Sequence, residues 1–264
     1  MIRIYSEEEI AIIEEANRLV AQTLKLLLEN LKPGVSAKKL DKLAEEFIRD
    51  HKAKPAFKGF EGYPAAICFS VNEEVVHGIP RPDKYPKEGD IVSIDLGVKY
   101  RGYYGDAAIS VVLPPADKSK YDLVKATYEA LHAGINMVKP GGRMGDVGNA
   151  IFQVAKRHGY DVVREYVGHG LGKSLHEDPS VPNYGVPGTG VLIRPGMVFT
   201  LEPMLTEGKG DVETLSDGWT TVTRDRKNSA HFEHAVAVLK DGIKILSLLP
   251  DGAEVFVPRS GEYS

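Results

Sequence analysis

The chain has 264 residues, of which 42% are hydrophobic and 27% charged, and its formal net charge at pH 7 is −4. These values are ordinary for a globular protein with a full core, and the lack of a basic run argues against nucleic acid as the main partner. The single cysteine, Cys68, excludes an intramolecular disulfide framework and a cysteine-rich zinc motif. A soluble protein of the reducing cytoplasm fits these features best.

The N-terminal segment has no basic stretch followed by an apolar run, which argues against a secretory signal. Ser6 and Glu9 instead have the spacing of a capping box, which predicts the start of an amphipathic helix. No apolar run is long enough to span a bilayer, so no membrane partner is expected.

Hydrophobic periodicity and turn residues predict an alternation of helix pairs and strand groups. Helices are expected near 7–31, 36–52, 119–138 and 144–158. Strands are expected near 65–71, 90–98, 103–113, 161–167, 197–202, 219–224, 231–240 and 243–247. This order indicates an α+β fold with antiparallel strands, and the segment 178–196, rich in proline and glycine, is expected to be a long surface loop.

The chain resembles itself when it is shifted by 107 positions. The residues that match include a Lys-Pro-Gly turn and several single positions: 32–34 with 139–141, His51 with His158, Gly89 with Gly196, and Asp95 with the acid Glu202. One such match would be chance, but several at one offset favour a duplication, with halves at about 6–113 and 118–248. Two related halves would pack around a pseudo-twofold axis, and a shared site is expected in the cleft between them.

Acidic residues stand in otherwise apolar, strand-like segments, and histidines accompany them. The acids are Asp95, Asp106, Glu202 and Glu233, and the histidines are His77, His169 and His176. Charged groups are rarely buried unless they are paired or bind a metal. Four acids in one place would repel one another unless a cation held them, so a metal site is the leading hypothesis.

Local patterns support this hypothesis and leave alternatives. A hairpin around Tyr100–Gly102 would set Asp95 directly opposite Asp106, within about 5 Å, unless one of them lies in the turn or faces solvent. A lone histidine is more often a packed or surface residue than a ligand, but His169 and His176 share a glycine-rich segment. Glu202 and Glu233 could form internal ion pairs, although their strand segments contain no basic residue.

One histidine with four carboxylates suits borderline or hard divalent cations such as Mn, Fe, Co or Zn. Two such ions about 3.5–4 Å apart can acidify a bridging water, which gives a nucleophile at neutral pH. The chemistry expected from these residues is metal-assisted hydrolysis at a chain end. The sequence has no complete P-loop, no H-E-x-x-H and no G-x-S-x-G motif.

The motifs that hold these residues resemble those of type I methionine aminopeptidases over nearly the whole chain. They are F-S-V-N-E-E-V-V-H-G-I-P at 69–80, G-D-I-V-S-I-D-L-G at 89–97 with G-D at 105–106, G-H-G-L-G at 168–172 with H-E-D-P at 176–179, and G-M-V-F-T-L-E-P-M at 196–204 with F-E-H at 232–234. The resemblance implies the pita-bread fold, with duplicated α+β halves, as one catalytic domain over residues 1–264.

The resemblance also implies roles for the candidate residues. Two divalent ions would be held by Asp95, Asp106, His169, Glu202 and Glu233. Asp106 and Glu233 would bridge the ions, Asp95 would bind one of them, and His169 with Glu202 the other. Glu202 would also serve as the general base. His77 and His176 would contact the substrate, with His176 polarising the scissile carbonyl or stabilising the oxyanion.

The implied activity is removal of the N-terminal methionine from nascent proteins whose second residue is small, by attack of a metal-bridging hydroxide on the first peptide bond. The implied protein is a cytoplasmic monomer that associates transiently with the ribosome. The methionine pocket would consist of Phe60, Tyr63, Cys68, Leu175 and Trp219, for which ordinary core packing is the alternative. Phe57 and Phe60 stand where bacterial relatives often have cysteine and tyrosine, and Leu175 where some have phenylalanine, so the pocket's shape is expected to differ.

Two rival readings remain at this point. A proline-directed aminopeptidase or prolidase shares the five ligand types, although such enzymes usually carry an extra N-terminal domain, and here the repeat begins at Ser6. A non-catalytic binding protein on the same fold would have lost ligands, whereas all five ligand positions are filled here.

Overall fold

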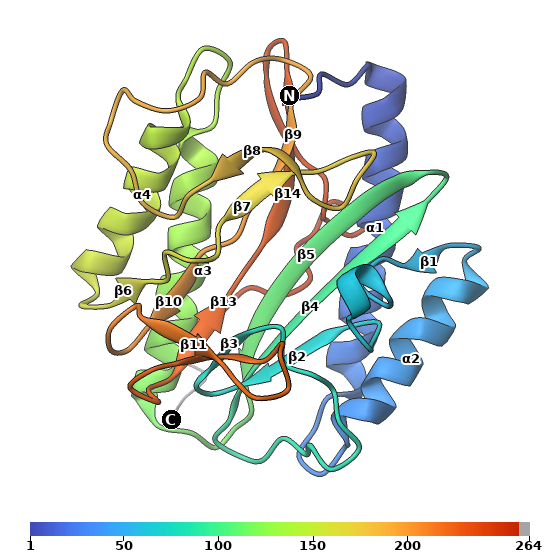
Figure 1. Cartoon of the computed structure of the whole chain (residues 1–264), viewed down its shortest axis with the longest axis vertical. Coiled ribbons are helices and arrows are strands. Elements are labelled where there is room, and N and C mark those ends of the chain that lie inside the picture. Colours follow the sequence, from blue (N-terminus) through green and yellow to red (C-terminus); the bar gives the residue numbers. More distant parts are fainter. Residues whose placement is uncertain (259–264) are drawn as a thin grey trace.

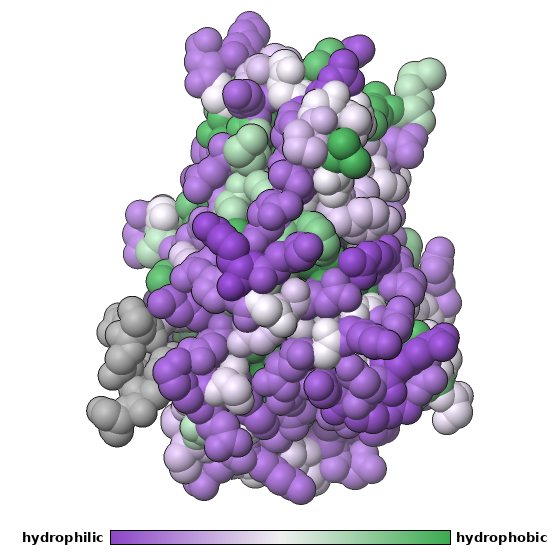
Figure 2. Space-filling model, turned by 90° about the vertical axis from the view of Figure 1, so that its left-hand side faces the viewer, coloured by the Kyte–Doolittle hydropathy of each residue, from purple (hydrophilic) through white to green (hydrophobic). Residues whose placement is uncertain are grey.

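The computed structural model describes residues 1–258, in which two pairs of helices flank the antiparallel strands (Figure 1). The first pair is α1 (Glu7–Asn30) and α2 (Ala37–Asp50), and the second is α3 (Lys118–Met137) and α4 (Met144–Arg157). Within the described residues no helix is long and apolar enough to cross a membrane. Figure 2 shows that the surface on the side of α3 and α4 is mainly hydrophilic, with small hydrophobic areas scattered over it.

The helix ends reproduce the repeat seen in the sequence. Both α1 and α3, and likewise both α2 and α4, end 107 positions apart, and α4 begins 107 positions after α2. The backbone repeats as well, since the residue after α1, Leu31, has φ −76° and ψ 118°, and the residue after α3, Val138, has φ −71° and ψ 121°. The turn glycines Gly34 and Gly141 have φ values of 83° and 80°. The same local sequence therefore ends both helices in the same way.

Side-chain caps begin the first two helices where the sequence predicted. Ser6 Oγ accepts the N–H of Glu9 at 3.2 Å, and the Glu9 carboxylate accepts the N–H of Ser6 at 3.0 Å, which completes the expected capping box. Ser36 Oγ caps α2 by accepting the N–H of Lys39 at 3.3 Å.

The strands form four small sheets, and every pairing among the described residues is antiparallel. One sheet holds β1 (Lys54–Pro55), β2 (Cys68–Val71), β4 (Ile91–Tyr100) and β5 (Tyr103–Val112); a second holds β7 (Gly168–Gly170), β8 (Glu177–Val181), β9 (Val198–Leu201), β14 (His234–Leu239) and β15 (Gly242–Ile245). The two three-stranded sheets are β6 (Asp161–Val162) with β10 (Met204–Thr206) and β13 (Ser229–His231), and β3 (Glu74–Val76) with β11 (Val212–Thr214) and β12 (Thr221–Thr223). The expected α+β architecture is present.

The hairpin of β4 and β5 has a different register from the predicted one. Its two turn residues, Arg101 and Gly102, both have positive φ, at 48° and 86°, as a two-residue turn of type I′ requires. Asp95 therefore pairs with Ala108, and Asp106 pairs with Gly97. The prediction that the two aspartates are directly opposed was wrong; they are diagonal neighbours on one face of the sheet.

The prediction of a loop at 178–196 was also partly wrong, because the first residues of this segment belong to β8. Pro179 lies within β8, which is the edge strand of its sheet. An edge strand tolerates proline because one side of its backbone needs no ladder hydrogen bonds. The strand expected at 231–240 is divided in two, and Glu233 stands at the break between β13 and β14.

Helix α1 packs closely against β5 beside Asp106. A Cβ atom at Gly105 would lie 2.6 Å from backbone atoms of Ala16, so only glycine allows this approach. The Asn17 side chain in the same turn of α1 accepts the backbone N–H of Asp106 at 3.1 Å. The helix thereby fixes the strand at the point where an acidic side chain enters the site.

We expect Gly105→Ala to lower the free energy of unfolding by about 1–3 kcal/mol, because the added methyl group overpacks this contact. Urea unfolding of the variant and of the parent chain measures the change. An unchanged midpoint and slope would mean that α1 can move away from β5 without cost.

Candidate metal centre

A cavity of about 350 Å³ brings together every site residue expected from the sequence. Its walls include the acids and the histidine expected to bind metal (Asp95, Asp106, His169, Glu202 and Glu233), the two other histidines (His77 and His176), and the residues expected to form a side-chain pocket (Phe60, Tyr63, Cys68, Leu175 and Trp219). These residues come from both halves of the repeat, so the cavity lies between the halves.

The four acids reach the cavity from three places in the fold. Asp95 and Asp106 point from the shared face of β4 and β5, and Glu202 directly follows β9. Glu233 is held between β13 and β14, where its backbone N–H donates to the carbonyl oxygen of Ala108 at 2.8 Å. That bond ties the second half of the chain to β5, close to Asp106.

The acids carry buried oxygen atoms that no protein donor satisfies. Oδ1 of Asp95, Oδ1 of Asp106 and Oε1 of Glu233 are buried and have no hydrogen-bond partner. Asp106 and Glu233 are each only 3% exposed, whereas Asp95 is partly accessible because it faces the cavity. Unsatisfied buried carboxylate oxygens are costly, and a cation is the partner that would satisfy several of them at once.

His169 on β7 directs its Nε2 atom toward two of the acids. Its Nδ1 lies 3.0 Å from the carbonyl oxygen of Gly170, which can only accept, so the proton is on Nδ1. Nε2 is then free of a proton and lies 3.5 Å from Glu202 Oε1 and 3.8 Å from Asp106 Oδ2. A backbone carbonyl that fixes the tautomer in this way is a common partner of metal-bound histidine.

Burial sets the protonation of these groups in the chain without metal. It raises the pKa of Asp95 to about 7, and burial together with neighbouring carboxylates raises the pKa of Asp106, Glu202 and Glu233 well above their usual values. Burial also lowers the pKa of His169 to about 3, so its imidazole is neutral at pH 7. The ligand atoms of Asp106, His169 and Glu233 lie within 4.8 Å of one another, and this donor set fits a divalent cation.

A family model described as metallopeptidase family M24 matches residues 11–240. The chain belongs to this family. A methionine aminopeptidase of Bacillus subtilis (strain 168) is 45% identical over 247 residues, which cover 94% of this chain and 99% of the relative. The crystal structure of a methionine aminopeptidase from Thermotoga maritima is similar with a TM-score of 0.92 and 46% identity, covering 94% of this chain and 99% of that one.

The comparisons confirm the resemblance to methionine aminopeptidases, the pita-bread fold and the metal-dependent aminopeptidase class. A prolidase from Pyrococcus furiosus has the same fold with a TM-score of 0.75, but it is 23% identical, and the match covers 93% of this chain and 65% of that chain. That likeness concerns the fold alone. Membership of family M24 and the donor set described above support binding of divalent metal.

Thr200 is a contact of this M24 site that the sequence analysis missed. Its hydroxyl donates to Glu202 Oε1 at 3.0 Å and accepts the backbone N–H of His169 at 3.0 Å. It is fully buried on β9, two residues before Glu202 and on the same face of the strand. That spacing was the signal that could have found it.

We expect Thr200→Val to lower kcat/KM about tenfold or more, because loss of a hydroxyl that orients a ligand costs 10- to 100-fold in comparable sites. Valine keeps the shape of threonine and the strand propensity. Thr200→Ser retains the hydroxyl and should restore most of the activity. Equal losses in both variants would mean that the hydroxyl does not position Glu202.

Aromatic rings line the cavity beside the acids. Tyr63 and Trp219 meet edge to face with ring centroids 5.1 Å apart, and Phe60 meets His176 in the same way at 5.2 Å. The His176 ring also lies 4.4 Å from that of His169. Further lining residues that the sequence analysis did not single out for the site are Glu61, Glu165, Tyr166 and Ser180. The cavity therefore has an acidic end and an aromatic end.

His77 follows β3 in a strained backbone conformation, with φ at 59°. Its ring meets Tyr166 edge to face, at a centroid distance of 5.1 Å. Burial lowers the pKa of His77 to about 4, so this imidazole is neutral at pH 7 as well. Non-glycine residues in this region of φ are uncommon and cluster at functional sites.

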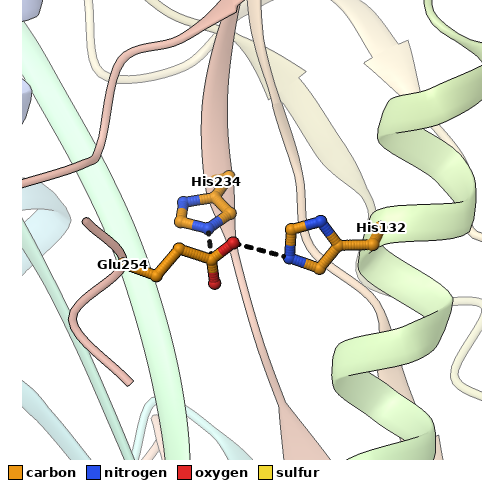
Figure 3. A group of neighbouring side chains, drawn as sticks. All are labelled: His132, His234 and Glu254. Carbon is orange, nitrogen blue, oxygen red and sulfur yellow. Dashed lines mark ion pairs between the residues drawn. The ribbon is translucent and has the colours of Figure 1, made fainter. Parts of the chain in front are cut away.

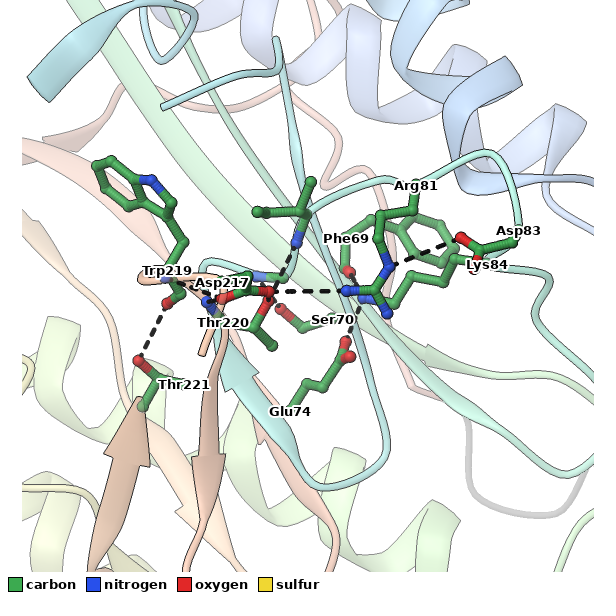
Figure 4. A network of polar contacts seen from close by, with 12 residues as sticks. Phe69, Ser70, Glu74, Arg81, Asp83, Lys84, Asp217, Trp219, Thr220 and Thr221 are labelled. Carbon is green, nitrogen blue, oxygen red and sulfur yellow. Dashed lines mark hydrogen bonds and ion pairs between the residues drawn. The ribbon is translucent and has the colours of Figure 1, made fainter. Parts of the chain in front are cut away.

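A polar network ties the loop after His77 to the loop that carries Trp219 (Figure 4). Arg81 lies 3.6 Å from the Asp217 carboxylate, which in turn accepts the backbone N–H groups of Trp219 and Thr220 at 3.0 and 2.8 Å. Lys84, which is 9% exposed, donates to the carbonyl oxygen of Phe69 at 2.8 Å and pairs with Glu74. These contacts hold two walls of the cavity relative to each other.

Proposed function

We propose that this metallopeptidase removes the N-terminal methionine from nascent proteins whose second residue is small, with two divalent metal ions as cofactor. The observation that carries the proposal is the cavity, whose lining combines a cluster of unsatisfied carboxylates with aromatic and apolar side chains. The activity named for relatives at 45% identity supports the choice of substrate.

The proposed ligands are Asp95, Asp106, His169, Glu202 and Glu233. Asp106 and Glu233, the most deeply buried acids of this set, would hold both ions, as the resemblance to methionine aminopeptidases implies. Asp95 would bind one ion, and His169 with Glu202 the other. Divalent ions bound there supply a water acidified at neutral pH. Mn, Fe, Co and Zn all suit the donors, and titration identifies the ion that works.

The remaining roles follow from protonation and position. Glu202, held by Thr200, is the proposed general base, which takes a proton from the attacking water and returns it to the leaving amine. His77 and His176 are neutral donors because burial lowers the pKa of both. An N–H of His176 would stabilise the oxyanion, and His77 would contact the peptide backbone.

The methionine side chain would enter between Phe60, Tyr63, Cys68, Leu175 and Trp219. A thioether suits an aromatic wall, because sulfur makes favourable contacts with ring edges. Burial raises the pKa of the Cys68 thiol, so Cys68 serves as an apolar wall residue rather than as a nucleophile. We further propose that residues 1–264 act as one catalytic domain, as a cytoplasmic monomer that meets nascent chains at the ribosome.

The deciding experiment is hydrolysis of Met-Ala-Ser by the full chain, stripped of metal and then titrated with Mn(II) or Co(II). Release of methionine that saturates when two ions are bound in the cavity supports the dinuclear proposal, and saturation with one ion bound there restricts it to a single ion. A parallel panel contains Leu-Ala-Ser and peptides of the X-Pro type. Preference for X-Pro would reverse the proposal in favour of a proline-directed peptidase, and no release from a folded, metal-loaded chain would favour a binding protein.

A further inference from the structure

A second cluster of metal-ligand side chains lies outside the cavity, at the C-terminal segment. His132 comes from α3, His234 is the first residue of β14, and Glu254 follows β15 (Figure 3). The ligand atoms of the three residues lie within 4.8 Å of one another. His132 Nε2 is 3.1 Å from Glu254 Oε1, and His234 Nε2 is 3.8 Å from Glu254 Oε2.

Tyr128 and both histidines interact with the Glu254 carboxylate, but neither imidazole has the geometry of a good hydrogen bond to it. His132 Nε2 is a buried atom that has no hydrogen bond of acceptable geometry, although the carboxylate is near. The distance of 3.8 Å from His234 Nε2 to the carboxylate is too long for a hydrogen bond. The chain offers a contrast in His158, whose Nε2 makes a true hydrogen bond to Glu129 at 2.9 Å. Two imidazoles thus share one carboxylate without either making a well-formed bond to it.

A divalent cation would satisfy all three groups. Two histidines and a glutamate are an established donor set for four-coordinate zinc, with one position open for water. The observed separations of 3.1 and 3.8 Å bracket the distance between two ligands that each lie about 2 Å from a tetrahedral ion. The side chains of His132, His234 and Glu254 are 26%, 9% and 18% exposed, so the cluster is sheltered but reachable from solvent.

The surroundings of His234 orient it for metal binding. Its Nδ1 lies 2.7 Å from the hydroxyl of Ser247, which also accepts the backbone N–H of Ala235 at 3.1 Å. The hydroxyl can accept the Nδ1 proton, which leaves Nε2 unprotonated and directed toward Glu254. Such outer hydrogen bonds hold metal-bound histidines in place. The ring of Tyr128 packs against that of His132 at 4.4 Å and restricts its rotation.

We propose that His132, His234 and Glu254 form a further metal site, for Zn²⁺ or a similar borderline divalent ion, that fastens the C-terminal segment to the body of the protein. The three ligands lie on a helix, a strand and a terminal segment that are distant in sequence. Glu254, Val255 and Phe256 cover a small space whose other walls include Ala108 and Phe232. The ion would therefore fix the segment next to β5, which carries Asp106, and next to the residues around Glu233.

Metal counting on the full chain tests this site apart from the catalytic one. After equilibrium dialysis against Zn(II), the parent chain is expected to hold one equivalent more than His132→Ala and Glu254→Gln. The matched control His158→Ala removes a histidine from an exposed His–Glu pair and should hold as much zinc as the parent. Co(II) added in place of zinc should give a tetrahedral absorption band that the His132 and Glu254 variants lose in part.

Hydrogen exchange gives a second readout that does not involve activity. At free Zn(II) 100 times the dissociation constant of the site, opening of residues 248–258 should be suppressed about 100-fold in the parent and unchanged in His132→Ala. Hydrolysis of Met-Ala-Ser by that variant with Mn(II) should stay near the parent level, since His132 lies outside the cavity. Equal zinc content in the parent and in both site variants, with no protection of the segment, would overturn the proposal. Failure of the proposed aminopeptidase activity would leave the zinc count unaffected.

Discussion

Glu202→Ala is expected to lower kcat/KM for Met-Ala-Ser by a factor of about 10³ or more while the chain stays folded. The carboxylate combines the proposed roles of metal ligand and general base, and loss of a general base alone costs about 10²–10⁴-fold. Steady-state hydrolysis at saturating Mn(II) measures the loss. Metal content measured on the same samples separates a lost ion from a lost base.

The fold should survive because Glu202 does not support it. In the metal-free chain its pKa is raised by burial and by the nearby Asp95, so the carboxyl is a cost to the folded state. The metal-free variant should therefore unfold at the same temperature as the metal-free parent or at a higher one. Such gains are expected where a residue is kept for function at the expense of stability.

Glu165→Ala is the matched control, since Glu165 lines the same cavity but is exposed and belongs to no proposed ligand set. Its activity should stay within about threefold of the parent, as expected for a surface change away from the reacting groups. Near-normal turnover by Glu202→Ala would contradict both roles assigned to that residue. A variant that no longer folds would contradict the electrostatic account of the metal-free state.

The helices could be predicted because residues close in sequence determine where each helix begins and ends. Ser6 and Ser36 cap α1 and α2, and the Lys-Pro-Gly turns after α1 and α3 stop the helices at matching positions. The repeat offset added a check that single-residue propensities lack, since each half predicts the ends of the other. Such local signals act whatever the rest of the chain does.

Short strands were not predictable in the same way. β3, β10 and β11 have three residues each, and they are strands only because a partner lies beside them. The hairpin register failed for a related reason, since it depends on which two residues take positive φ. Arg101 is an unusual occupant of such a position. The observed turn centre lies one residue later than the predicted one, which shifts Asp106 by two places in register relative to Asp95.

The acids that line the cavity could be singled out from the sequence because an acid is conspicuous in an apolar strand. Asp95 and Glu202 stand out in this way, and the repeat aligns them. The residues that position the acids were missed because nothing in the local sequence distinguishes them from other polar residues, and their hydrogen-bond partners are known only from the fold. Thr200 is one strand residue among many, and Asn17 lies in a helix 89 positions before the backbone amide that it caps. Candidate ligands are thus visible in the local sequence, whereas the residues that position them are defined only by the three-dimensional fold.

The metal-free chain is expected to become less stable as the pH rises from about 6.5 to 8. The folded chain keeps protons on its buried acids, because the pKa of Asp95 is about 7 and those of Asp106, Glu202 and Glu233 lie well above their usual values. The unfolded chain has already lost these protons near pH 4. Below about pH 4 the protonated acids therefore favour the folded chain, and this contribution to the free energy of unfolding is lost as the pH rises toward their folded-state pKa values.

The buried histidines have the opposite sign and act mainly in a lower pH range. Burial lowers the pKa of His77 to about 4 and of His169 to about 3, so the unfolded chain, in which histidine titrates near pH 6.5, binds more protons at these residues up to about pH 7.5. In the lower part of the window the histidines therefore offset some of the loss caused by the acids, and above about pH 7.5 the acids dominate. Each proton that the folded chain keeps between pH 6.5 and 8 lowers the free energy of unfolding by about 2 kcal/mol over the window.

Urea unfolding at pH 6.5, 7.25 and 8, with EDTA or with saturating Mn(II), measures this dependence. The metal-loaded chain should be nearly flat over the window, because a bound cation keeps the carboxylates ionised in the folded state. Asp106→Asn, which removes one of the repelling acids, should reduce the slope of the metal-free chain. Parallel pH dependences with and without metal would mean that the acids are already ionised in the empty site. In that case groups other than a cation would have to balance their charge, and the case for the metal centre would lose its electrostatic basis.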